Sequence, residues 1–259
     1  MTERLHVDAT GEGPPLVLLH GWAMHSGLWG GLVDRLARRH RVHAVDLPGH
    51  GESPDPAQFT LDGVVDALDA TFATTPRPIS VMGWSLGGLI AMRWALARPD
   101  RVERLALVST TPRFVAAADW PHAMAPETLA RFGDELRVAW KLTVQRFLAL
   151  QLHGGEHSRA LLADMRERLL ARKPPSPATL GEALALLRDS DLRNDAAGIE
   201  QPALVVSGER DTLAFPEAGR FLAARLPRAR FELIAGAAHV PFLSHPDAFG
   251  SALAGFLDG

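Results

Sequence analysis

The sequence contains no cysteine, and this absence removes several kinds of chemistry. A chain without thiols cannot form disulfide bonds, bind a metal through thiolates or use a cysteine nucleophile. Long hydrophobic runs are also missing, because no apolar stretch reaches the ~18 residues that a membrane-spanning helix needs. The first residues lack the basic segment and apolar core of a secretory signal peptide, so we expect a cytoplasmic protein that is not attached to a membrane.

Lysine is scarce, and positive charge does not exceed negative charge. Lysine occurs only at Lys141 and Lys173, and the 27 basic residues against 30 acidic ones give a net charge of −3. Because no overall basic field surrounds such a chain, we expect no nucleic-acid partner. The loop at residues 49–53 has glycines but no following Gly-Lys-Ser/Thr, so it does not resemble a phosphate-binding loop. We expect no metal and no cofactor.

The residues that are present suit one large α/β domain. A chain of 259 residues, 47% of them hydrophobic, can bury a substantial core. In the first half, short apolar runs alternate with helical patterns, which is typical of a mostly parallel sheet covered on both faces. Strands are predicted over residues 4–9, 15–20, 41–46, 79–82 and 104–109, and helices over 26–39, 60–74 and 86–98.

The middle of the chain has a different character. Strand-like runs are missing between residues 110 and 201, and helices are predicted over 126–136, 138–152, 157–172 and 177–189. Strands are expected again over 203–208 and 230–235, with helices over 215–225 and 245–257. We therefore expect residues 1–109 and 202–259 to form the core and residues 110–201 to form a helical lid insertion over an active site.

The segment Gly83-Trp84-Ser85-Leu86-Gly87 lies between a predicted strand and a predicted helix. This pattern is a nucleophile elbow, in which glycines leave room for a strained turn and the serine hydroxyl projects above the sheet. The alternative is a glycine-rich turn without chemistry. The strand and helix on either side favour the catalytic interpretation.

A serine nucleophile needs a base, and the base needs a carboxylate that orients it. Asp211 follows the predicted strand at 203–208, and His239 follows the one at 230–235, which matches the chain order serine, acid, histidine. Glu209 is a rival acid, but it lies nearer the strand end. His245 is a rival base, but it precedes Pro246 at a helix start, so we predict catalysis by Ser85, Asp211 and His239.

The segment His20-Gly21-Trp22 ends another predicted strand. Gly21 would let the backbone approach a substrate, so the N–H groups of Trp22 and Leu86 are predicted to form an oxyanion hole. The loop Asp46-Leu47-Pro48-Gly49-His50-Gly51 is interpreted as structural.

These motifs, together with Gly208-Glu209-Arg210-Asp211 and Ala238-His239-Val240-Pro241-Phe242, resemble the α/β-hydrolase superfamily over nearly the whole chain. The resemblance implies a mostly parallel sheet flanked by helices. Within the superfamily, the chain is similar to the carboxylesterase family of biotin synthesis. The segments Arg146-Phe147-Leu148-Ala149-Leu150-Gln151, Asp191-Leu192-Arg193 and Ser244-His245-Pro246 carry that similarity.

The family resemblance implies a serine carboxylesterase that hydrolyses the methyl ester of pimeloyl-acyl carrier protein through an acyl-enzyme and releases methanol. The implied substrate contacts are Trp22, Ser85, Leu86, Phe147, Leu148, Ala149, Leu150, Gln151 and His239. In addition, Trp140, Val144, Phe147 and Gln151 share one helical stripe that could line an acyl channel or only pack the lid on the core.

Carrier-protein contacts are implied at Arg146 and Arg159, whereas Leu142 and Ala163 stand where the family has further arginines. Between residues 137 and 173 there are eight basic and three acidic residues, a local net charge of +5 that would attract an acidic carrier protein. A solvated arginine-rich surface is the alternative interpretation of that charge.

Two other interpretations exist for the same scaffold. One is a second enzymatic function, a broad short-chain carboxylesterase or a carbon–carbon bond hydrolase, which would use the same three residues. The other is a non-catalytic hydrolase-like receptor, and the presence of serine, acid and histidine in the right order argues against it. Serine rather than aspartate at position 85 argues against dehalogenase or epoxide-hydrolase chemistry, which needs a carboxylate nucleophile. We expect the protein to be a monomer.

Overall fold

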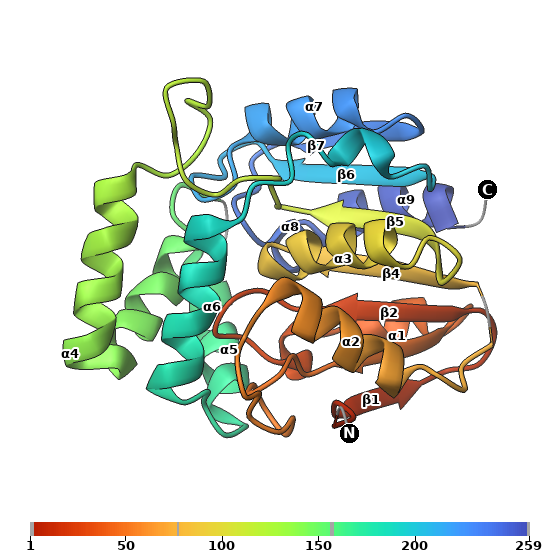
Figure 1. Cartoon of the computed structure of the whole chain (residues 1–259), viewed down its shortest axis with the longest axis horizontal. Helices are drawn as coiled ribbons and strands as arrows, with labels where there is room; N and C mark the ends of the chain where they lie inside the picture. Colours follow the sequence, from red (N-terminus) through yellow and green to blue (C-terminus); the bar gives the residue numbers. More distant parts are fainter. Residues whose placement is uncertain (1–2, 77, 156–157, 258–259) are drawn as a thin grey trace.

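The computed structural model describes residues 3–76, 78–155 and 158–257. Within these ranges the strands form one seven-stranded sheet in the order β1-β3-β2-β4-β5-β6-β7 (Figure 1). Their bounds are β1 Val7–Thr10, β2 Pro15–Leu19, β3 Arg41–Val45, β4 Ile79–Trp84, β5 Val102–Val108, β6 Ala203–Gly208 and β7 Ala229–Ile234. Only β1 is antiparallel to its neighbour, so the other six strands share one carboxyl edge.

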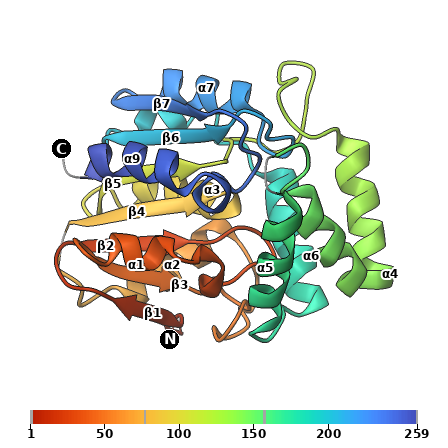
Figure 2. The same ribbon diagram turned by 180° about the vertical axis from the view of Figure 1, so that it is seen from behind.

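The central strands are apolar along their whole length because helices cover both faces of the sheet. All six residues of β4 and all six of β6 are buried. Helices α2 (Leu61–Thr71) and α3 (Leu86–Ala97) cover the face seen in Figure 1. Helices α1 (Leu32–Leu36) and α9 (Pro246–Leu257) cover the opposite face (Figure 2), and α7 (Pro216–Arg225) packs against β6 and β7. A predominantly parallel sheet between helices confirms the predicted fold class.

The helix predicted over residues 26–39 is wrong as one element. A short 3₁₀ helix, η1 (Ser26–Trp29), is followed by Gly30 at φ 58°, and α1 begins only at Leu32. A positive φ cannot continue a right-handed helix, and glycine adopts it at little cost. Gly30 therefore divides the element. A four-residue helix, α8 (Pro241–Ser244), has no counterpart among the predicted elements.

A helical segment connects β5 to β6 and lies beyond the carboxyl edge of the sheet (Figure 1). It contains α4 (Pro126–Leu150), α5 (Ser158–Leu170), α6 (Pro177–Asp189) and the 3₁₀ helix η2 (Ala196–Gly198). The two helices predicted at 126–136 and 138–152 correspond to α4, which is kinked where Ala139 leaves helical geometry (φ −144°, ψ 53°). The predicted start of α5 at His157 lies outside the described residues. No helix within the described ranges combines enough length with enough apolar character to span a bilayer.

Candidate active site

Ser85 occupies the sharp turn between β4 and α3. Its backbone has φ 56° and ψ −116°, a conformation that non-glycine residues rarely adopt and that costs of the order of 1–3 kcal/mol. The turn is held from both sides, because the Ser85 N–H donates to Val108 O (2.9 Å) and the hydroxyl of Thr110 donates to Ser85 O (2.7 Å). A Cβ at Gly87 would lie 2.0 Å from Leu19 O, so only glycine lets α3 start this close to β2. These contacts hold the strained serine at the carboxyl edge of the sheet.

Asp211 and His239 are paired at the same edge. The Nδ1 atom of His239 lies 2.8 Å from Oδ2 and 3.0 Å from Oδ1 of Asp211, and both side chains are buried. The carboxylate also accepts hydrogen bonds from the backbone N–H groups of Leu213 (2.9 Å) and Ala214 (3.0 Å). Because an ionised carboxylate only accepts, the proton of a neutral His239 sits on Nδ1 and leaves Nε2 free to act as a base.

The rival residues have other partners. Glu209 is exposed and its Oε2 accepts the backbone N–H of Gly236 at 2.9 Å. His245 is paired through Nδ1 with the Ser244 hydroxyl at 2.9 Å. Both therefore differ from Asp211 and His239, which hydrogen-bond to each other.

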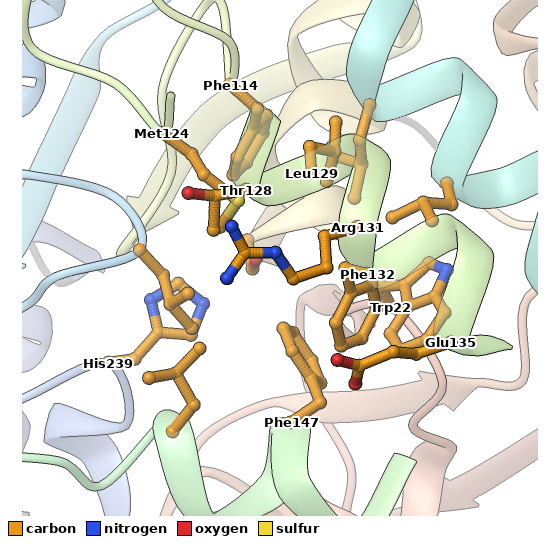
Figure 3. A pocket seen from close by; sticks show the side chains of 15 residues that line it. Trp22, Phe114, Met124, Thr128, Leu129, Arg131, Phe132, Glu135, Phe147 and His239 are labelled. Carbon is orange, nitrogen blue, oxygen red and sulfur yellow. The ribbon is translucent and has the colours of Figure 1, made fainter. Parts of the chain in front are cut away.

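Ser85 and His239 open into one cavity with a mainly apolar lining (Figure 3). His239 lies on one side, and Trp22, Phe132 and Phe147 face it from the other. Trp22 contacts both phenylalanines edge to face, with ring centroids 5.3 and 5.0 Å away. The remaining lining residues are Phe114, Met124, Thr128, Leu129, Arg131, Glu135, Leu150, Leu184, Leu187 and Leu213. Such a cavity suits an alkyl chain whose reacting end reaches the serine.

Trp22 and Leu86, whose N–H groups are the predicted oxyanion donors, both belong to segments next to Ser85. Gly21 is so close that a Cβ on it would lie 3.4 Å from the Cβ of Ser85, while Leu86 is the first residue of α3. Within the described residues, neither N–H donates a hydrogen bond to another group of the chain. Two free donors beside a nucleophile, one of them at a helix N-terminus, can bind a developing oxyanion.

The structure separates the predicted substrate contacts into two groups. The side chains of Trp22, Phe147 and Leu150 line the cavity together with Ser85 and His239. The others do not line it: Leu86 and Leu148 are in the core, Ala149 is exposed and Gln151 is buried.

Gln151 nevertheless contacts the loop that carries the base, since its carbonyl oxygen accepts the His239 N–H at 3.0 Å. Its side-chain Nε2 is buried without a hydrogen-bond partner among the described residues. Of the stripe formed by Trp140, Val144, Phe147 and Gln151, only Phe147 lines the cavity. Trp140 and Val144 pack α4 against the hydrophobic core instead.

Sequence reasoning missed the first half of α4. Leu129 and Phe132 line the cavity at the i,i+3 spacing of one helical face, and Arg131 and Glu135 add two charges beside them. The spacing of these apolar residues is enough to predict an apolar face on the helix. Whether that face points toward Ser85 depends on how α4 packs against α6, and the sequence alone does not give that packing.

Arg146 and Arg159 are both exposed, on α4 and α5 respectively. Arg146 donates to Glu135 at 3.1 Å, and Glu135 lines the cavity. This ion pair places Arg146 beside the wall of the cavity.

Asp46 connects the helical segment to the core. Its fully buried carboxylate accepts the N–H groups of Ser26 (2.7 Å) and Glu52 (2.9 Å) and the guanidinium of Arg172 (2.8 Å). Burial opposes ionisation of Asp46, but the hydrogen bonds that the carboxylate accepts from Glu52 and Ser26 favour the ionised form, and the pKa of Asp46 is lowered. Since Arg172 follows α5, this contact fixes the end of α5 against the core, as the structural interpretation of this loop predicts.

Comparison with known proteins places this geometry in a class. The α/β-hydrolase fold family matches residues 14–246, and the chain belongs to it. An esterase from Exiguobacterium antarcticum has the same fold, with a TM-score of 0.91 at 21% identity, covering 98% of this chain and 96% of that one.

Two curated relatives narrow the class. A pimeloyl-[acyl-carrier protein] methyl ester esterase from Nitrosomonas europaea is 45% identical over 247 residues, 95% of this chain and 97% of that protein. One from Xanthomonas oryzae pv. oryzae is 44% identical over 255 residues, 98% of each chain. The chain is thus a carboxylic ester hydrolase of the pimeloyl-[acyl-carrier protein] methyl ester esterase family.

Proposed function

We propose that this protein hydrolyses the methyl ester of a pimeloyl chain carried on acyl carrier protein, using Ser85, His239 and Asp211 as a catalytic triad. The observation that carries the proposal is the joint opening of Ser85 and the Asp211-paired His239 into one apolar cavity. The names of the relatives supply the substrate class.

The reaction runs through an acyl-enzyme. Nε2 of His239 takes the proton of the Ser85 hydroxyl while the oxygen attacks the ester carbonyl carbon, and the carbonyl oxygen becomes an oxyanion bound by the N–H groups of Trp22 and Leu86. His239 then returns the proton to the departing methoxy oxygen, and methanol leaves. A water molecule, deprotonated by His239, attacks the acyl-enzyme and regenerates Ser85 with release of the carboxylate. Asp211 stabilises the imidazolium in both halves of the reaction.

Residues 110–201 act as the lid in this proposal. The indole N–H of Trp22 donates to Leu180 O on α6 at 3.0 Å, and its ring packs against Phe132 and Phe147 of α4. One residue therefore joins the oxyanion loop to two lid helices. The methylene groups of the acyl chain would lie along this aromatic wall, which excludes water from the reacting ester.

The carrier protein would approach over the basic part of the lid. Arg146 lies next to the cavity wall through Glu135, and Arg159 is exposed on α5, within the region of local charge +5. Acidic carrier proteins would be attracted to such a surface.

The direct test is hydrolysis of carrier-bound pimeloyl methyl ester by the purified protein, followed by mass spectrometry of the carrier. We expect a loss of 14 Da, one CH₂, as the methyl ester becomes an acid, and no loss with Ser85→Ala. Expression should also restore growth without biotin to a strain that lacks its own esterase. If small esters are hydrolysed but the carrier-bound ester is not, the protein is a broad short-chain carboxylesterase.

A further inference from the structure

His20, the residue that follows β2, is completely buried, and both of its ring nitrogens have backbone partners. Nδ1 lies 2.8 Å from the carbonyl oxygen of Gly21, and the N–H of Leu47 donates to Nε2 at 3.0 Å. A carbonyl oxygen only accepts and a backbone N–H only donates. The ring is therefore the neutral tautomer that carries its proton on Nδ1.

The surroundings of His20 keep the ring neutral. Burial, reinforced by the neighbouring His50 whose ring centroid is 5.2 Å away, lowers the pKa of His20 to about 3 despite the opposing charge of Asp46. A neutral ring whose acceptor nitrogen is already occupied by Leu47 cannot serve as a general base near neutral pH. His20 can therefore affect the reaction only through the hydrogen bond that its Nδ1–H donates to Gly21 O.

That hydrogen bond acts on the peptide unit beside the nucleophile. The carbonyl of Gly21 and the N–H of Trp22 belong to one planar trans peptide, so fixing the oxygen on one side fixes the N–H on the other. The N–H of Met24 also donates to Gly21 O, at 3.2 Å. The same turn holds Ala23 at φ 62°, a strained conformation that the surrounding contacts must maintain.

We propose that His20 is a positioning residue for ester hydrolysis: its Nδ1–H holds the Gly21–Trp22 peptide so that the Trp22 N–H faces the oxyanion formed on the Ser85 adduct. This inference rests on the proposed function, since it needs a serine nucleophile and an oxyanion. In this role His20 contacts neither the substrate nor Ser85 and acts through the backbone amide of Trp22.

The kinetic consequence follows from when the Trp22 N–H is needed. An oxyanion donor interacts most strongly with the transition state, so misdirecting it lowers kcat and leaves KM nearly unchanged. Removal of a whole donor costs roughly 10²–10³ in kcat in other serine hydrolases. Misorientation of the Trp22 N–H should cost at least about 10-fold.

Two variants separate the two hydrogen bonds of His20. In His20→Asn, the amide NH₂ can occupy the place of Nδ1 and donate to Gly21 O, while the acceptor for Leu47 is lost. In His20→Gln, the amide oxygen can occupy the place of Nε2 and accept from Leu47, while the donor to Gly21 is lost. Both variants remove the ring and keep a polar amide, and Gln retains one methylene more than Asn, so a loss of packing alone would be larger in His20→Asn.

We expect kcat for p-nitrophenyl butyrate to be at least about 10-fold higher in His20→Asn than in His20→Gln, with KM within about 2-fold of the wild type in both. The inhibition constant of a trifluoromethyl ketone, which forms a tetrahedral adduct with a serine, should rise in His20→Gln in parallel with the loss of kcat. Equal losses of kcat in the two variants, or a loss confined to KM, would overturn the proposal and leave His20 a packing residue.

A measurement on the wild type does not depend on either variant folding. Long-range ¹H–¹⁵N spectra of histidine-labelled protein should show His20 protonated on Nδ1 between pH 6 and 8, and protonation on Nε2 would overturn the proposal. Ser85→Ala separates this inference from the proposed function. If Ser85→Ala still hydrolyses the ester, the proposed function and the role of His20 both fail. If Ser85→Ala is inactive but kcat falls equally in His20→Asn and His20→Gln, only the positioning role of His20 is contradicted.

Discussion

The carboxylate of Asp211 illustrates how much of the site depends on single hydrogen bonds. It accepts from His239 Nδ1 and from the N–H groups of Leu213 and Ala214, all at 2.8–3.0 Å. Those two amide donors fix the orientation of the carboxylate toward the ring of His239. Glu209, only two residues away, instead accepts from the Gly236 N–H, within the loop that leads to His239.

Asp211→Asn should lower kcat for a p-nitrophenyl ester by about 10⁴-fold, because an amide can present an N–H to Nδ1 and favour the wrong tautomer of His239. Glu209→Gln is the matched control and should stay within about 3-fold of the wild type. If kcat falls little in Asp211→Asn and strongly in Glu209→Gln, Glu209 rather than Asp211 is the acid that orients His239.

The strained backbone of Ser85 gives a stability prediction. Ser85→Ala and Ser85→Gly both lack the nucleophile and should lose about 10⁶-fold in kcat. Glycine tolerates φ 56° and ψ −116°, whereas alanine keeps the strain. We expect the free energy of unfolding in urea to be about 1 kcal/mol higher for Ser85→Gly than for Ser85→Ala, despite the greater chain entropy of unfolded glycine. The reverse order would mean that the elbow stores no strain at Ser85.

At the scale of elements, α4 and the segment that follows α5 meet the core by different interactions. Helix α4 contributes apolar and aromatic side chains to the cavity, and outside the cavity it carries exposed Val138 and Leu142 near Arg146. The end of α5 is fixed through Arg172, which contacts Asp46, Asp8 and the Ser26 hydroxyl. Helix α4 therefore meets the core mainly through apolar side chains, whereas the end of α5 is held by ion pairs and a hydrogen bond.

Arg172→Ala should destabilise the fold by about 2–4 kcal/mol, because it leaves the buried Asp46 carboxylate without its cation. The folded-state pKa of Asp46 is lowered, so its ionisation stabilises the fold above the unfolded pKa, and this stability is lost as pH falls through the folded value. The difference between wild type and Arg172→Ala in urea unfolding should thus be larger at pH 7 than at pH 3.5. A difference independent of pH would show that Arg172 acts through packing.

The exposed arginines of the lid can be tested separately from the chemistry. Replacing Arg146 and Arg159 by glutamate should lower kcat/KM for the carrier-bound ester at least about 10-fold, because repulsion slows the encounter. Hydrolysis of p-nitrophenyl butyrate should change less than about 2-fold. Arg4→Glu with Arg228→Glu is a control of equal charge change at exposed sites outside the lid. If both substrates suffer equally, the lid arginines stabilise the lid and do not bind the carrier.

At the scale of the whole molecule, charge is distributed unevenly. The chain has a net charge of −3, yet residues 137–173 carry a local +5. The acidic carrier protein of the proposed function would be attracted to this part of the chain and repelled by the rest, which would orient it on the enzyme. The association rate would then be sensitive to salt.

Raising the ionic strength from 20 to 150 mM shortens the Debye length to ~8 Å and should lower kcat/KM severalfold for the carrier-bound ester. The uncharged p-nitrophenyl ester should be unaffected. Equal salt dependence for the two substrates would assign the effect to the enzyme itself and would exclude steering.

Local patterns in the sequence were sufficient for most elements of the fold. The bounds predicted for β6 and α6 are those observed, because an apolar run and a capped amphipathic helix are defined by adjacent residues. The helix predicted over 26–39 was wrong because Gly30 takes a left-handed conformation that the apolar spacing did not reveal. The 3.6-residue spacing around Phe147 indicated a stripe, but not which of its members would face the cavity.

What the sequence determined by itself was the class of fold and the candidate reacting groups, since Ser85, Asp211 and His239 each follow a strand that ends at one edge of a parallel sheet. The tertiary structure decided everything that depends on which distant segments touch. Examples are the pairing of Asp211 with His239 across 28 residues, the lining of the cavity by the first half of α4, and the contact of Arg172 with Asp46. The hydrogen bond from His20 to Gly21 joins adjacent residues, but the second partner of the ring, the N–H of Leu47, comes from the end of another strand and is brought there only by the fold.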